Sequence, residues 1–94
     1  MKSGMRDTEY ATEIDTAILP LGDRQEARLE RLLVKSTGEE EIRFSWWSTN
    51  SQGVLGFANR PLDLNEDDLL RLFQIALAKK VFSEKFRAQL KTLL

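Results

Sequence analysis

Residues 41–49 (EIRFSWWST) constrain the fold of this chain more than any other segment, because β-forming side chains dominate them. Apolar side chains occupy alternate positions there, as in a strand with one buried face. Turn-forming residues follow at positions 50–53, and residues 54–58 (VLGFA) have the pattern of a returning strand. The sequence therefore predicts a β-hairpin over residues 41–58.

The two adjacent tryptophans of this hairpin must point to opposite faces of the sheet, because side chains alternate along a strand. Trp46 shares its parity with Ile42 and Phe44, so we predict that Trp46 is in the core and that Trp47 is the more accessible of the two. Two interpretations of Trp47 stay open. It either joins a small apolar cluster with the N-terminal strand, or it belongs to a recognition surface, because exposed Trp and Arg are frequent at binding hot spots.

Two amphipathic helices are predicted at the C-terminal end of the chain, over residues 66–80 and 84–93. Asn65 and Ser83 precede them as N-cap residues, and apolar side chains then recur at helical spacing. The first apolar stripe consists of Leu69, Leu72, Phe73, Ala76 and Leu77, and the second of Phe86, Leu90 and Leu93.

The N-terminal part of the chain is less decisive. Residues 1–12 are small, polar or charged without periodicity, so we expect a disordered tail followed by a single domain over residues 13–94. Residues 14–21 predict a short edge strand that ends at a tight turn. Residues 23–35 fit a helix, by their capping box and leucine spacing, and equally a long hairpin strand, because turn signals bracket them.

Together these elements predict an α+β fold. An antiparallel sheet contains the hairpin and the N-terminal strand or strands, and the two C-terminal helices cover one of its faces. A hairpin alone is marginally stable, so the segment before it must supply further strands or a helix. The length of 94 residues allows one compact domain.

The composition excludes most of the common catalytic chemistry. The chain has no histidine and no cysteine, which rules out Ser-His-Asp and Cys-His catalysis, Cys/His zinc sites and disulfides. Its glycines form no phosphate-binding loop. Residues 63–68 begin like a calcium loop, but Asp68 stands where that loop needs glycine, so a capped helix start is favoured. We therefore predict a non-enzymatic protein with no cofactor and no metal site.

The charge balance argues against polyanionic partners. The chain has 14 Lys and Arg residues against 15 Asp and Glu, so it lacks the cationic field that drives binding to nucleic acids or anionic membranes. Arg87 and Lys91 point away from the apolar stripe of their helix, which favours a solvated helix face. No apolar run is long enough for a membrane span or a signal peptide, so we expect a cytoplasmic protein without a membrane partner.

Three short segments carry a resemblance. RFSWW at residues 43–47, RPLDL at 60–64 and VFS at 81–83 resemble a pattern of small uncharacterised bacterial proteins, over roughly the C-terminal half of the chain. The resemblance implies a bacterial origin and a compact stand-alone protein. It implies no activity, and no functional residue can be transferred from it.

The leading functional hypothesis is a protein-interaction module that uses the sheet face opposite the helices, with Arg43, Trp47 and Arg60 as the candidate interaction surface. A second copy of the chain is one candidate partner, because Leu70 and Ile75 lie outside the main apolar stripe of the first helix. The alternative is a single-stranded nucleic-acid-binding protein in which Trp47 stacks on a base and the two arginines contact phosphates. A regulatory subunit of an enzyme is not separable from the first hypothesis by sequence.

Overall fold

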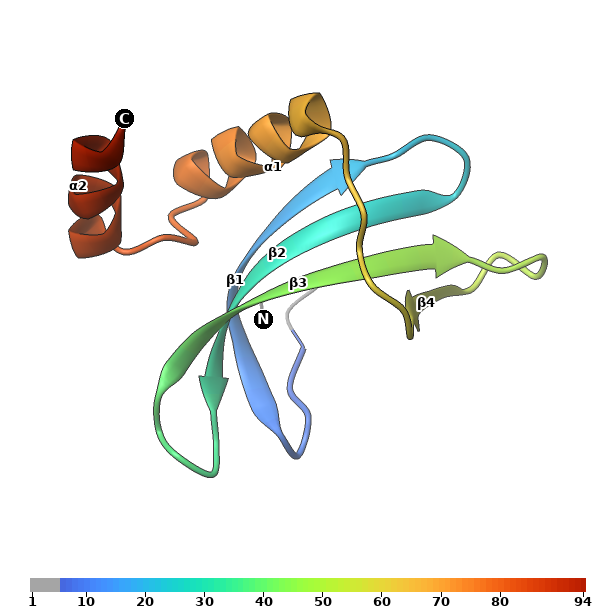
Figure 1. The fold of residues 1–94 in the computed structure, drawn as a ribbon. Coiled ribbons are helices and arrows are strands. Elements are labelled where there is room, and N and C mark those ends of the chain that lie inside the picture. The colour runs from blue at the N-terminus through green and yellow to red at the C-terminus, as the bar shows by residue number, and fades with distance from the viewer. Residues whose placement is uncertain (1–5) are drawn as a thin grey trace.

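The computed structural model of the protein describes residues 6–94. Four antiparallel strands form one sheet in the order β1-β2-β3-β4, and two helices follow it (Figure 1). The elements are β1 (Ala11–Pro20), β2 (Gln25–Val34), β3 (Glu40–Thr49), β4 (Leu55–Ala58), α1 (Glu66–Ala78) and α2 (Glu84–Leu93). The predicted α+β class is confirmed, with the hairpin formed by β3 and β4 and the two C-terminal helices at their expected positions along the chain.

The ambiguous segment at residues 23–35 forms strand β2. Leu29 pairs with Ala17 of β1 on one side and with Phe44 of β3 on the other, so hydrogen bonds to two neighbours outweigh the helix propensity of the segment. The turn before it needs left-handed backbone, with φ values of 94° at Gly22 and 57° at Arg24. This turn directs the chain back along β1 and thereby favours a strand.

The chain is ordered earlier than the sequence suggests. Strand β1 begins at Ala11. The amide of Glu13 donates to the carbonyl oxygen of Arg6 (2.8 Å), and the amide of Lys35 donates to the carbonyl oxygen of Tyr10 (3.0 Å). The expectation of a disordered tail through residue 12 is therefore wrong for residues 6–12, because backbone pairing orders a stretch with few apolar side chains. Residues 1–5 of the expected tail lie outside the described residues.

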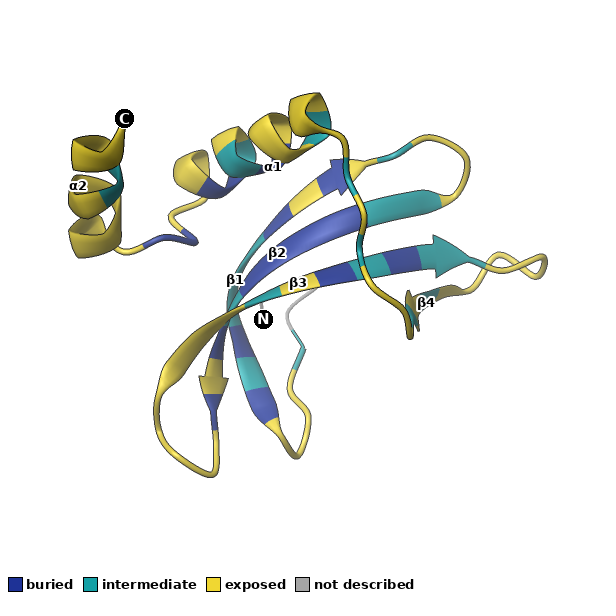
Figure 2. Ribbon diagram, viewed as in Figure 1, coloured by how far each residue is buried: buried dark blue, intermediate teal, exposed yellow. Residues whose placement is uncertain are grey.

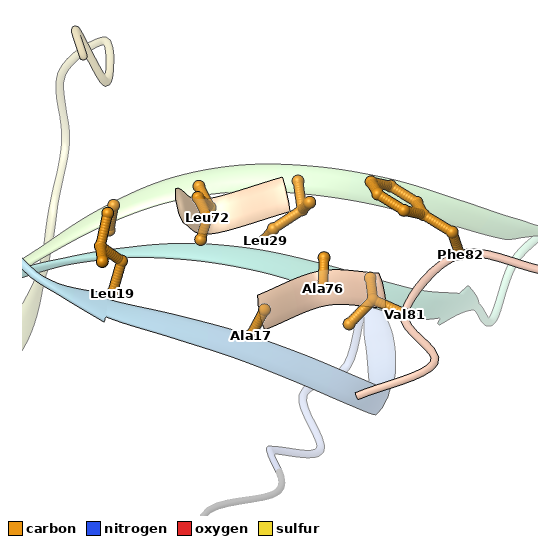
Figure 3. Packing of buried hydrophobic residues seen from close by; sticks show 8 residues of the cluster. Ala17, Leu19, Leu29, Leu72, Ala76, Val81 and Phe82 are labelled. Atoms are coloured by element: carbon orange, nitrogen blue, oxygen red, sulfur yellow. The ribbon is translucent and has the colours of Figure 1, made fainter. Parts of the chain in front are cut away.

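The apolar core lies between α1 and strands β1 and β2 (Figure 3). Small side chains meet there, since Ala17, Ala27 and Ala76 are all fully buried and allow the helix to approach the sheet closely. The other buried members of this cluster are Leu19, Leu29, Leu72, Val81 and Phe82. We call the sheet face under α1 the helix face and the opposite one the open face.

The two helices differ in how they are held. Asn65 and Ser83 cap them as predicted, with side-chain oxygens that accept from the amides of Asp68 (2.8 Å) and Phe86 (3.1 Å). α1 packs on β1 and β2. In the described part of the chain, α2 does not pack on any strand, and it is largely exposed beside the end of α1 (Figure 2). One helix therefore covers half of the sheet, and the other projects from the domain.

Candidate functional site

The three residues proposed as an interaction surface do not share one face of the sheet. Arg43 and Trp47 belong to the open face, on alternate positions of β3. Arg60 lies instead over the ring of Trp46, with its guanidinium carbon 4.0 Å from the ring centroid, at the helix face. The structure therefore brings together two of the three residues and separates them from the third.

Trp47 is buried, with 7% of its surface exposed, so the prediction that it is the accessible tryptophan is wrong. The guanidinium groups of Arg6 and Arg28 lie over its ring, at 4.7 and 4.2 Å from the ring centroid. Phe57 of β4 meets the ring edge-on at 5.9 Å, and the indole N–H donates to Oγ of Ser45 at 2.9 Å. Two arginines and a phenylalanine thus give this face a cover that the periodicity of β3 does not reveal.

Trp46 is only half-buried, although it shares the face of the apolar core. Its indole N–H donates to Oε1 of Gln25 at 2.9 Å, and Arg60 covers the ring. The physical reason is the position of α1, which packs on β1 and β2 and does not extend over β3. Membership of the helix face is therefore not enough to bury a side chain of β3.

A buried carboxylate lies at the centre of the open face. Glu30 of β2 has no exposed surface, and its Oε1 accepts from Oγ of Ser45 (2.9 Å) and from Nε of Arg43 (3.2 Å). Arg6 adds an ion pair to Oε2 at 3.7 Å. Desolvation acts to raise the pKa of Glu30, but hydrogen bonds from Glu13, Arg43 and Ser45 and the charge of Arg43 outweigh it and lower this pKa. Glu30 is therefore held as a charged carboxylate.

Glu13 of β1 is the carboxyl partner of Glu30 and has a raised pKa. A bulge between Glu13 and Asp15 inserts an extra residue into β1, which turns the Glu13 side chain to the open face. Burial, the hydrogen bond to Glu30 and the charge of Glu30 raise the pKa of Glu13 to about 7. Within residues 6–94, Oε1 of Glu13 and Oε2 of Glu30 have no other hydrogen-bond partner, so one proton shared between the two carboxyl groups satisfies both.

This pair is a structural element of the sheet. Two carboxyl groups with separated pKa values are the arrangement of many acid–base sites. Glu13 and Glu30 are, however, 4% and 0% exposed, so a substrate has no access to them. Sequence reasoning missed the pair, and the available signal was a glutamate at the centre of a strand-length segment that is otherwise rich in leucine.

The surface open to a partner lies on the helix face of β3. Ile42 is 38% exposed and Phe44 is 49% exposed, on the strand that α1 leaves uncovered. Glu40 precedes them on the same face and pairs with Arg31 of β2, with Nη1 to Oε1 at 2.8 Å. We call Glu40, Ile42 and Phe44 the β3 patch. Adjacent exposed apolar side chains of this kind mark interaction surfaces more often than isolated ones do.

A second unpartnered surface belongs to α2. Phe82, just before this helix, packs against Phe86 with ring centroids 5.0 Å apart, and this contact connects α2 to the core. The rest of its apolar stripe faces solvent, with Leu90 half-buried and Leu93 80% exposed. An open groove runs beside α2 between Leu77 of α1 and Leu94, and it is also lined by Ala88, Leu90, Arg87 and Lys91. The predicted outlying residue Ile75 packs against the core, whereas Leu70 is 61% exposed.

Comparisons with known proteins add no relative to this description. No known protein family, no curated protein and no solved structure matches the chain. Among residues 6–94, neither helix has the length and apolar character needed to cross a membrane. The candidate site therefore rests on the geometry of the chain itself.

Proposed function

We propose that this protein is a non-enzymatic protein-interaction module whose contact surface is the β3 patch together with the apolar stripe of α2. The observation that carries the proposal is the half-covered helix face, on which Phe44 is 49% exposed while Leu29, its neighbour in β2, is fully buried under α1. A two-layer domain gains stability by covering such a face. A partner that binds there therefore buries apolar surface that the isolated chain leaves in water.

The residues singled out in the sequence take different parts in this proposal. Arg43 and Trp47 act indirectly, because they build the interior of the open face and so hold β3 in place. Arg60 lies at the rim of the contact surface, since it covers Trp46, the next residue after the β3 patch on the same face. An apolar centre with a charged rim is the usual anatomy of a protein interface.

The nucleic-acid alternative receives less support. Stacking on a base requires an accessible aromatic face, and Arg6 and Arg28 already lie over the ring of Trp47. The net charge of −1 supplies no general attraction to phosphates. The bacterial origin and cytoplasmic location that the sequence suggests remain part of this proposal, and they do not affect the choice of surface.

A photo-crosslinking amino acid at position 44 tests the proposal in the cells that make the protein. We expect a discrete crosslinked protein from position 44, because Phe44 is the more exposed of the two apolar side chains in the β3 patch. The matched control carries the crosslinker at position 70, which is also exposed and apolar but lies on α1, away from β3. A crosslinking pattern that is the same from both positions, or absent from both, would refute the proposed surface.

A further inference from the structure

We infer that the partner of the β3 patch is a second copy of this chain, whose α2 docks on the patch while the first copy's α2 docks on the second. This inference rests on the proposed function and names its partner. It follows from the coincidence of an uncovered sheet face and an unused amphipathic helix in one small domain.

The dimensions of the two surfaces agree. α2 contains 10 residues, which corresponds to a helix about 15 Å long. The β3 patch occupies residues 40–44, which span about 15 Å along the strand. The space above them adjoins α1 and Phe82, so a docked helix would complete the second layer of the sheet and lie beside α1.

The connection between the helices explains why α2 of the same chain does not fill this space. Val81 and Phe82 are buried in the core, and Nε of Arg31 donates to the carbonyl oxygen of Val81 at 2.6 Å. Lys80 adopts a left-handed conformation with φ 59°, which turns the chain between the helices. This anchored turn directs α2 away from its own sheet, as Figure 1 shows.

The chemistry of the two surfaces is complementary. The apolar stripe of α2, which consists of Phe86, Leu90 and Leu93, matches the exposed Ile42 and Phe44. The charges are also opposite. α2 carries the cations Lys85, Arg87 and Lys91 against the single anion Glu84, and the β3 patch carries the carboxylate of Glu40, whose side chain is half-exposed beside Arg31. Electrostatic complementarity of this kind fixes orientation and excludes wrong partners.

Two-fold symmetry satisfies both surfaces at once. Each copy offers one helix and one patch, so reciprocal docking of two copies leaves neither surface open and gives a closed dimer rather than a chain of subunits. A partner of different sequence would need two separate complementary surfaces, one for the patch and one for α2. The second copy is therefore the occupant that accounts for both features together.

Sedimentation equilibrium of the full chain tests the inference. We expect the wild type to reach twice the monomer mass of 10.8 kDa as the concentration rises. Phe44→Lys in the patch and Leu90→Glu in α2 should each weaken the association at least about tenfold, because each puts a charge into the apolar contact. Leu70→Lys is the matched control, since it makes the same kind of change on an exposed apolar residue of α1 and should leave the association unchanged.

A mixture of the two weakened variants gives the decisive measurement. In each variant alone both docking sites carry a charge. A mixed dimer instead has one site with its native Phe44 and Leu90 and a second site in which the introduced lysine would meet the introduced glutamate. The mixture should therefore associate more tightly than either variant alone. A mixture that associates no better, or a Leu70→Lys control that dissociates as strongly, would overturn reciprocal docking of α2 on β3. Circular dichroism of each variant checks that it is folded.

The outcome also separates this inference from the proposed function. A wild type that stays at 10.8 kDa at the highest concentration overturns the inference, and the function survives if position 44 still crosslinks to a different protein. A monomer without such crosslinks overturns both.

Discussion

The buried pair of Glu13 and Glu30 predicts an unusual dependence of stability on pH. Glu13 has a pKa of about 7 in the folded protein, against an ordinary value of 4.5. Between these two values the folded protein binds more protons than the unfolded chain does, so the free energy of unfolding falls as the pH rises. The stabilisation is fully present below about pH 4.5 and is lost by about pH 7. Glu30 has the opposite linkage, but its lowered pKa confines its effect to more acidic pH.

The magnitude follows from the two pKa values of Glu13. One pKa unit corresponds to about 1.4 kcal/mol, so between pH 5 and pH 8 the free energy of unfolding should fall by about 2–3 kcal/mol. Glu13→Gln should remove this fall, because a neutral amide can donate a hydrogen bond to Glu30 as the protonated acid does and cannot ionise. The variant should therefore match the wild type near pH 5 and exceed its stability near pH 8.

Urea denaturation at several pH values between 5 and 8 measures this effect. Glu9→Gln is the control, since it removes the same charge from an exposed residue and should keep the wild-type dependence on pH. A wild type that is more stable at pH 8 than at pH 5 would refute the reasoning. So would a Glu13→Gln variant with the same pH dependence as the wild type, because the proton would then not reside on Glu13.

Three further predictions concern the buried contacts. Trp47→Ala should lower the free energy of unfolding by about 3–5 kcal/mol, because the side chain is buried. In single-tryptophan variants, iodide should quench the fluorescence of half-buried Trp46 more strongly than that of Trp47, and the opposite order would contradict the burial of Trp47. Arg6→Ala should lower the free energy of unfolding by about 1–2 kcal/mol, because the contacts of Arg6 with Glu30 and the Trp47 ring are lost, and the thermal midpoint should fall by several degrees. An unchanged midpoint would mean that these contacts are not made in solution. Arg31→Met should lower the free energy of unfolding by about 1.5–3 kcal/mol, because the carbonyl oxygen of Val81 loses a charged hydrogen-bond donor. An unchanged urea midpoint would contradict an anchored connection between the helices.

The sequence correctly predicted those elements whose boundaries depend on residues close together along the chain. The alternation of residues 41–49 and the turn after them were sufficient for the hairpin of β3 and β4. The caps at Asn65 and Ser83 located both helices, because a cap is a hydrogen bond between residues three positions apart. Residues 23–35 could not be assigned in the same way, since the strand depends on hydrogen bonds to β1 and β3.

The candidate site was less predictable than the fold. Parity correctly separated Trp46 from Trp47 but not their burial, because burial depends on what covers each face. Arg6 reaches Trp47 and Glu30 from a segment that has no apolar periodicity of its own. The bulge in β1 reverses the side-chain alternation there and brings Glu13 to Glu30, and a bulge has no reliable signature in a single sequence.

Composition and local sequence were enough to establish the absence of histidine and cysteine chemistry, the near-neutral charge, the hairpin and the two capped helices. Each of these depends on composition or on residues close together along the chain. Long-range packing, by contrast, sets which strands the helices cover. α1 covers β1 and β2 and leaves Ile42 and Phe44 exposed, and α2 projects without a strand beneath it in the described residues. These features depend on where a helix comes to rest on a sheet, and that position is set by packing between the small side chains of Ala17, Ala27 and Ala76, far apart in sequence.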